Sequence, residues 1–221
     1  MDADSLVLVG SKNRTAFTMR RPAPCIVFNA IRDDPTWGDE RCFALIKDVT
    51  GLDNTGEVAC APKYELVCDV VADHVYMVKV LIHNTASGHL NLIAKDVSVC
   101  LSCPTGIVSG SAMIQVQICA SNIGETVTGR RGKCGVVWSE VYLKCENSHS
   151  FGVSYVPGSG RYYNNVKDFS TEGFTLGDSI ISESGVKVGY EKMDGIIPGC
   201  FQYGGFLTFL LSVKSSLAES W

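Results

Sequence analysis

Hydrophobic and polar residues alternate with a period of two along most of this chain. Residues 112–119 place three aliphatic side chains on one side of an extended backbone and two glutamines on the other, which is typical of a strand with one buried face. Residues 74–83 are apolar on both sides, which indicates a strand covered on both faces. Similar short runs predict further strands at 6–9, 25–31, 42–49, 64–71, 96–103, 136–143, 151–156, 186–191 and 206–213.

Turn signals separate these runs, and helical patterning is scarce. Glycine occurs with Asn, Asp, Ser or Pro in most of the intervals between them, as in chains whose strands are joined by tight turns. We therefore predict an all-β fold, a single β-sandwich or jelly-roll-like domain over residues 1–221 with long loops and little helix. A short polar C-terminal tail is expected from about residue 214. The longest polar intervals, which are candidate functional loops, are 32–41, 121–133 and 158–173.

Composition and charge limit the function classes. The 221 residues are 46% hydrophobic and 19% charged, which excludes disorder for most of the chain. The net charge of −4 excludes a polybasic nucleic-acid binder, so such a contact would need a local patch. No apolar run reaches about 18 residues, and the acidic start precedes only a short apolar run, so we expect neither a transmembrane helix nor a signal peptide. The predicted location is the cytoplasm, with a virion as the alternative, and the ten cysteines are expected to be reduced.

Cys100 and Cys103 form a C-x-x-C pair, the spacing of many zinc ligands. On a strand, residues three apart point to opposite faces, so this pair could bind a metal only if a turn replaced the strand. A structural zinc site also needs a second pair of ligands, and no other two cysteines have a similar spacing. We therefore expect buried thiols, with zinc binding as the alternative, and we expect no cofactor.

Cys134 is the candidate nucleophile. It lies in Gly132-Lys133-Cys134-Gly135, where flanking glycines would let backbone amides point at an oxyanion. This segment resembles the G-x-C-G of viral chymotrypsin-like cysteine proteases, and His149 stands fifteen residues later, where that family places a histidine of the specificity pocket. The family's general base precedes the nucleophile in an N-terminal barrel, whereas the first histidine here is His74. Without a base the thiol stays protonated, so a cysteine hydrolase is kept only as an alternative.

Two basic clusters, one at residues 20–21 and one at residues 130–133, could form a phosphate-binding patch if the fold brings them together. Tyr162 and Tyr163 follow Arg161 in another loop and could supply surface for base stacking. The alternative is solvated loop cations or charges at the rim of a subunit contact. The candidate nucleic-acid-binding residues are Arg130, Arg131, Lys133, Arg20 and Arg21.

The loop from Asp33 to Glu40 concentrates four carboxylates around Trp37. The EF-hand pattern for calcium is absent, and the spacing does not single out a glycosidase-type pair. Aromatic side chains carry much of the energy of protein interfaces, so we interpret Trp37 as an anchor for a partner. The same reasoning makes Trp221, Tyr162 and Tyr163 candidate interface residues.

No arrangement of a nucleophile with a base emerges from the order of the residues, so we expect no enzyme. The leading hypothesis is a non-enzymatic structural or interaction protein that acts through its surface and associates with itself, of the type found in viral coats, matrix layers and movement proteins. Its partner would be a second copy or another protein. The alternatives are a nucleic-acid or host-factor binding module that uses residues 130–133, and a hydrolase that uses Cys134.

Overall fold

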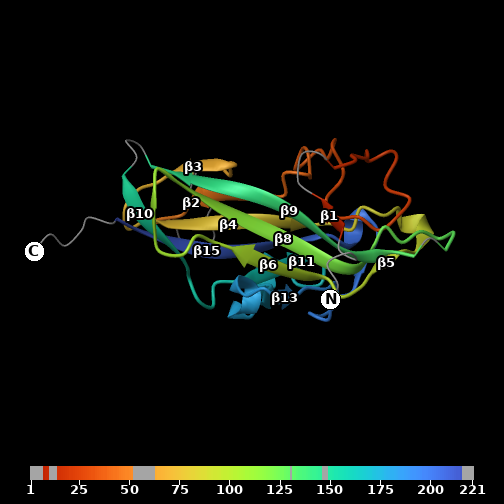
Figure 1. Cartoon of the computed structure of the whole chain (residues 1–221). Coiled ribbons are helices and arrows are strands. Elements are labelled where there is room, and N and C mark those ends of the chain that lie inside the picture. The colour runs from red at the N-terminus through yellow and green to blue at the C-terminus, as the bar shows by residue number, and fades with distance from the viewer. Residues whose placement is uncertain (1–6, 10–13, 52–62, 130, 146–148, 216–221) are drawn as a thin grey trace, which may run out of the picture.

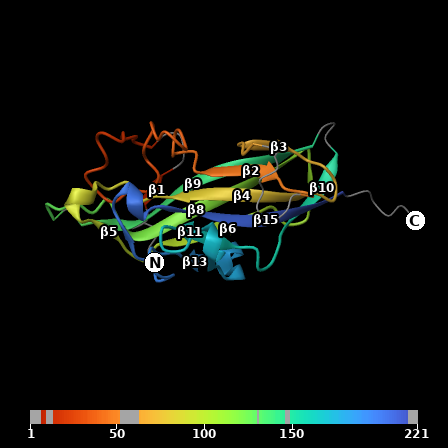
Figure 2. The same ribbon diagram turned by 180° about the vertical axis from the view of Figure 1, so that it is seen from behind.

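β-Strands make up most of the regular structure, and the helical elements are 3-10 turns of three or four residues. The computed structural model describes residues 7–9, 14–51, 63–129, 131–145 and 149–215. In Figures 1 and 2 the long strands run along the long axis of the molecule. Within the described ranges, no helix is long and apolar enough to cross a membrane.

The first sheet contains β1 (Val7–Val9), β3 (Val67–Asp69), β6 (Ser98–Ser102), β8 (Ser111–Ile123), β9 (Lys133–Lys144) and β13 (Val186–Lys187). A long antiparallel pair, β8 with β9, forms its middle, and β6 and β13 follow beyond β8. Both β1 and β3 run parallel to β9, β1 near its start and β3 near its end. The long strand β9 therefore joins β1 and β3, which are far apart in the sequence.

The second sheet contains β2 (Ala44–Asp48), β4 (Val75–Ile82), β7 (Ile107–Ser109), β10 (Ser150–Tyr155), β11 (Arg161–Asn164), β12 (Phe174–Thr175) and β15 (Gly205–Ser215). Its middle strand is β15, which pairs with β4 along one side and with β10 and β11 along the other. Further out, β2 pairs with β4, β7 with β10, and β12 with β11, all antiparallel.

Smaller elements lie outside the two sheets. They are the strands β5 (Ile93–Ala94) and β14 (Ile197–Pro198), which pair with each other, and the turns η2 (Gly88–Leu90), η4 (Phe169–Thr171), η5 (Asp178–Ile181) and η6 (Phe201–Tyr203).

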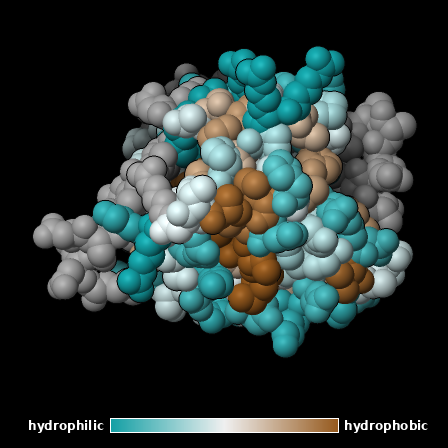
Figure 3. All heavy atoms as spheres, turned by 90° about the vertical axis from the view of Figure 1, so that its right-hand side faces the viewer, coloured by the Kyte–Doolittle hydropathy of each residue, from teal (hydrophilic) through white to brown (hydrophobic). Residues whose placement is uncertain are grey.

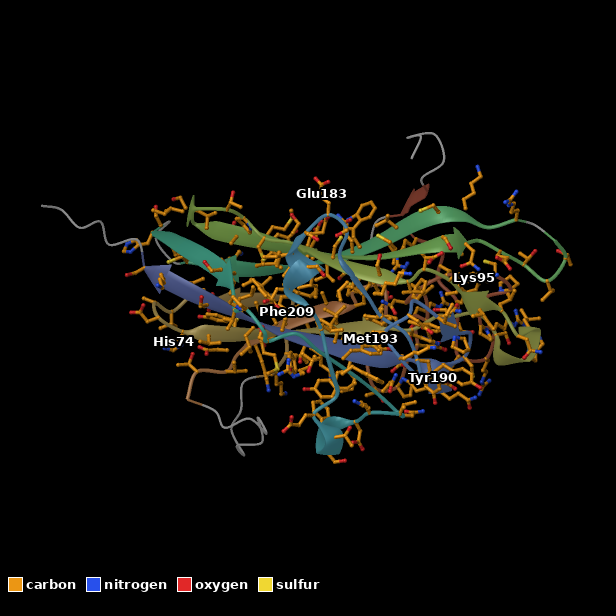
Figure 4. The ribbon with its side chains drawn as sticks, turned by 90° about the horizontal axis from the view of Figure 1, so that it is seen from below. His74, Lys95, Glu183, Tyr190, Met193 and Phe209 are labelled. Atoms are coloured by element: carbon orange, nitrogen blue, oxygen red, sulfur yellow. The ribbon has the colours of Figure 1, made fainter. Side chains whose placement is uncertain are left out.

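The inward-facing side chains of both sheets form one hydrophobic cluster. Alternate residues of β4 and β15, such as Tyr76, Val80 and Phe209, are fully buried, as are Ile114 and Ile118 of β8. Figure 4 shows Phe209 between the two layers of strands. This packing follows from the period of two, because every second side chain of a strand points to the same face. The all-β prediction is thereby confirmed.

Two predicted strands differ from the structure. Residues 25–31 make only isolated bridges, such as Phe28 with Asn84, because Asn29 has a left-handed backbone (φ 47°) that interrupts an extended run. Residues 186–191 are a strand only over β13, because the chain then turns and passes Gly195, whose φ is 91°. At the other end of the chain, β15 continues to Ser215, and the predicted tail beyond it, with Trp221, lies outside the described residues.

Candidate functional site

A small cavity opens at one end of the sandwich, where the loop before β2 and the segment after β14 meet the end of β4. Its volume is about 170 Å³. We name it the loop-end pocket. Its lining includes Met19, His83, Thr85, Ser87, Cys200 and Phe201.

His83, which lines the loop-end pocket, pairs with the carboxylate of Glu40, which is not itself a lining residue. Glu40 is fully buried, and its Oε1 lies 2.8 Å from Nδ1 of His83, which is itself only 3% exposed. The second carboxylate oxygen, Oε2, accepts a hydrogen bond of 3.1 Å from the backbone N–H of Ile31. This fixes the plane of the imidazole, which also meets the ring of Phe201 edge-on at 5.5 Å between centroids. With Nδ1 bonded to Glu40, Nε2 is the ring nitrogen of His83 that remains for a further hydrogen bond.

The backbone around this pair is held by side chains. The amide of Asn29 donates to the carbonyl of Leu81 and accepts from the N–H of His83, both at 2.8 Å. Arg14 is buried and donates to the carbonyl of Asn29 at 2.9 Å. Burial, together with the charge of Arg41, lowers the pKa of Arg14 to about 10. These hydrogen bonds tie the segments around His83 to one another.

Cys200 adds strain to the rim. Its backbone has φ 132° and ψ 149°, a combination that is essentially restricted to glycine. Its side chain packs closely against Gly88. Although Cys200 and His83 line the same pocket, the described structure shows no hydrogen bond between the two side chains. A nearby polar contact joins Ser87 Oγ to His89 Nδ1 at 2.8 Å.

The acidic loop is bonded internally. Asp34 is 5% exposed, and its Oδ1 accepts the N–H groups of Thr36 and Trp37 at 2.7 and 2.6 Å. The indole N–H of Trp37 donates to the carbonyl of Cys42 at 3.1 Å, so this half-buried ring is fixed by the loop itself. Carboxylates of this loop therefore stabilise the loop itself, and Glu40 is the partner of His83.

The two candidate tyrosines face opposite sides of the second sheet. Tyr162 is fully buried in the core opposite Leu207, so the prediction that it lies in a loop at an interface is corrected. The period of two in β11 accounts for this, because it turns one ring inward and the next outward. Tyr163 is half-buried on the outer face, where it stacks on Phe169 at 4.2 Å between centroids.

The candidate basic residues lie on two separate segments. Arg131 and Lys133 are exposed at the start of β9, and Arg130 is outside the described residues. Arg20 and Arg21 are exposed in a tight turn that begins at Thr18. Among the described residues, no hydrogen bond or ion pair joins the two clusters. A joint phosphate-binding patch stays a prediction.

The cysteine protease pattern is not assembled. Cys134 lies at the start of β9, and His149 follows its far end, where its carbonyl accepts from Gly110. At about 3.3 Å per residue, the ten residues between Cys134 and Lys144 alone span roughly 30 Å. The two side chains therefore cannot act on one substrate group.

All nine described cysteines are partly exposed, so Cys100 and Cys103, which we expected to be buried thiols, are only partly buried. In β6, Cys100 points away from the core-facing Val99 and Leu101, toward Gln117, and Cys103 packs against the core. The two thiols thus lie on opposite sides, as predicted. Among the described residues, no cluster of His, Cys, Asp or Glu has the arrangement of a metal site.

The Glu40–His83 pair was missed because its members are 43 residues apart and each lies in an uninformative local sequence. The only local signal of this pair was that Glu40 stands two residues before an apolar run, Cys42 to Val49. No protein-family model, curated protein or solved structure matches this chain.

Proposed function

We propose that this chain is a non-enzymatic interaction protein that binds a protein partner through the loop end, and that the partner is a second copy of the chain. The observation that carries this proposal is the apolar rim of the loop-end pocket. Phe201 is 49% and Met19 is 41% exposed, and Ile93 and Ile196 are exposed on neighbouring segments. Figure 3 looks at this end and shows an apolar area at its centre.

The size of the pocket favours a protein side chain over a small molecule. Small-molecule sites usually enclose about 300 to 1,000 Å³, whereas this pocket has about 170 Å³. That volume suits one apolar or aromatic side chain as an anchor, and anchors of this kind carry much of the energy of an interface. The hydrogen bonds that hold His83 support the proposal, because a pre-organised side chain loses little freedom on binding.

Charge supports a second copy as the partner. The chain has a net charge of −4, so most surfaces would repel each other across a twofold axis. The residues that line the pocket include no Asp, Glu, Lys or Arg. An isologous contact places a surface against itself, and an apolar surface is compatible with that arrangement. A chain that associates in this way would serve as a structural subunit, of the type found in coats, matrix layers or movement proteins, in the cytoplasm or in a virion.

Sedimentation velocity over a range of protein concentrations tests the proposal. We expect wild-type protein to shift from monomer to dimer as the concentration rises, and Phe201→Ser to shift the midpoint at least tenfold higher. The matched control is Ile107→Ser, since Ile107 is 69% exposed in β7, which pairs with β10 at the other end of the molecule (Figure 1). A wild-type protein that stays monomeric at every concentration would refute the proposal, as would equal effects of the two substitutions.

A further inference from the structure

The outer face of the second sheet gathers lysines and aromatic rings. We name it the lysine–aromatic face. In β4, Tyr76, Val78 and Val80 face the core, so Lys79 faces outward. Figure 4 shows η4, coloured as in Figure 1, on the side of β4 and β15 that faces away from the first sheet. The members of the lysine–aromatic face are Trp37, Lys47, Tyr64, Lys79, Tyr163, Phe169 and Phe206.

Three of the rings form a stack with one open side. Tyr163 and Phe206 are cross-strand partners with centroids 5.4 Å apart, and Phe169 of η4 lies 4.2 Å from Tyr163 and 5.1 Å from Phe206. Phe169 is nevertheless 64% exposed. An aromatic ring held in place from one side and open on the other is the geometry on which a nucleobase stacks.

The two lysines continue from this stack. Nζ of Lys79 lies 4.3 Å from the centroid of Phe206 and 5.6 Å from that of Tyr64, and Nζ of Lys47 lies 4.7 Å from the same Tyr64 ring. Rings and ammonium groups thus follow one another without interruption from Phe169 to Lys47.

These ammonium groups have no anionic partner in the described part of the chain. None of the ion pairs there involves Lys47 or Lys79. Lys47 is only 8% exposed, and burial together with the charge of Lys47 lowers the pKa of Lys79. Partly buried charges without a counter-ion are unfavourable, so this face would gain from a negatively charged occupant.

We propose that the lysine–aromatic face binds single-stranded nucleic acid, with a base on the open side of Phe169 and a phosphate at Lys79. Lys47, which is only 8% exposed, adds positive charge nearby. Stacking rings in contact with cations fit a ligand that alternates flat bases and anions. An anionic membrane is less well matched, because electrostatic binding to lipid uses clusters of four to eight basic residues. This site is separate from residues 130–133 and from the loop-end pocket, so it stands independently of the proposed self-association.

The test is fluorescence anisotropy with a fluorescein-labelled twelve-nucleotide oligo(U) and an abasic strand with the same number of phosphates. We expect the oligo(U) to bind at low salt, to dissociate as salt rises, and to bind more tightly than the abasic strand. Phe169→Ala should weaken binding about tenfold, since stacking contributes about 1–3 kcal/mol per base, and Lys79→Gln should reduce both affinity and salt dependence.

Two matched controls locate the effect. Ile107→Ala removes an exposed apolar side chain in β7, and Lys187→Gln removes an exposed cation in β13 of the first sheet, and neither should change the affinity. Near-UV circular dichroism checks that Phe169→Ala keeps its fold, as expected for a ring that is 64% exposed.

Three outcomes would overturn the proposal. They are no binding of oligo(U) at low salt, equal affinity for the abasic strand, and equal losses in the control variants. Binding to phosphatidylserine vesicles that depends on Phe169 and Lys79, without binding of oligo(U), would assign this face to a membrane instead.

Discussion

The Glu40–His83 pair makes a quantitative prediction about stability. In Glu40→Gln the side chain keeps its shape, but it has one oxygen for two buried donors, Nδ1–H of His83 and N–H of Ile31. One of these donors must then face an amide NH₂ group. Leaving a buried donor without an acceptor costs about 1–3 kcal/mol. Removing both acceptors in Glu40→Ala breaks the whole pair, for which about 3–5 kcal/mol is expected.

Urea unfolding followed by tryptophan fluorescence measures both effects. Asp39→Asn is the matched control, because Asp39 is the adjacent acid, lies 38% exposed and pairs with Arg41 at 2.6 Å. An exposed pair of this kind contributes at most about 1 kcal/mol. The order of stability should be wild type, Asp39→Asn, Glu40→Gln and Glu40→Ala. If Glu40→Gln were as stable as Asp39→Asn, the carboxylate would not be needed to satisfy both donors, and the reasoning would fail.

Two further predictions concern single positions. Cys200→Gly should be more stable than Cys200→Ala by about 1–3 kcal/mol in thermal or urea unfolding, because only glycine relieves the backbone at φ 132°; the opposite order would show that the backbone there is not strained. Burial raises the pKa of Tyr76 to about 12 from its usual 10.0. The unfolded chain therefore loses this proton first, and its contribution to stability is lost as the pH rises from about 10 to 12. Tyr76→Phe should lower the urea midpoint at pH 8 but show a smaller further decrease at pH 11, and an equal decrease would contradict this assignment.

The strands were predictable where the alternation of side chains is regular over several residues. Residues 112–119 have this pattern, and their burial depends only on the pleat of the backbone. Residues 206–213 were predictable for another reason, because they form a nearly continuous apolar run of strand-forming residues. Tyr162 was misplaced because β11 has only four residues and lies between glycine-containing segments. Such a short strand carries too little periodicity to be distinguished from a loop.

The candidate sites depended on pairings that no local pattern contains. Lys79 stood in a run that was expected to be covered on both faces, and nothing near it indicated Phe206 or Tyr64 as neighbours. Those contacts follow from the register of β4 with β15 and from a loop that crosses the face. For the same reason Glu40 was identified only as one of four carboxylates around Trp37, since its partner His83 approaches only when the loop folds onto the end of β4.

The position of β15 has a consequence for how the protein is made. This strand joins β4, β10 and β11, yet it follows all three in the sequence. While a ribosome is still adding residues, at about 5–20 per second, the second sheet therefore lacks its middle strand. The edges of β4 and β10 that β15 later covers are then unpaired and are accessible to chaperones or to other nascent chains. The second sheet can close only after residues 205–215 have left the exit tunnel, so it closes later than the synthesis of every strand that β15 joins.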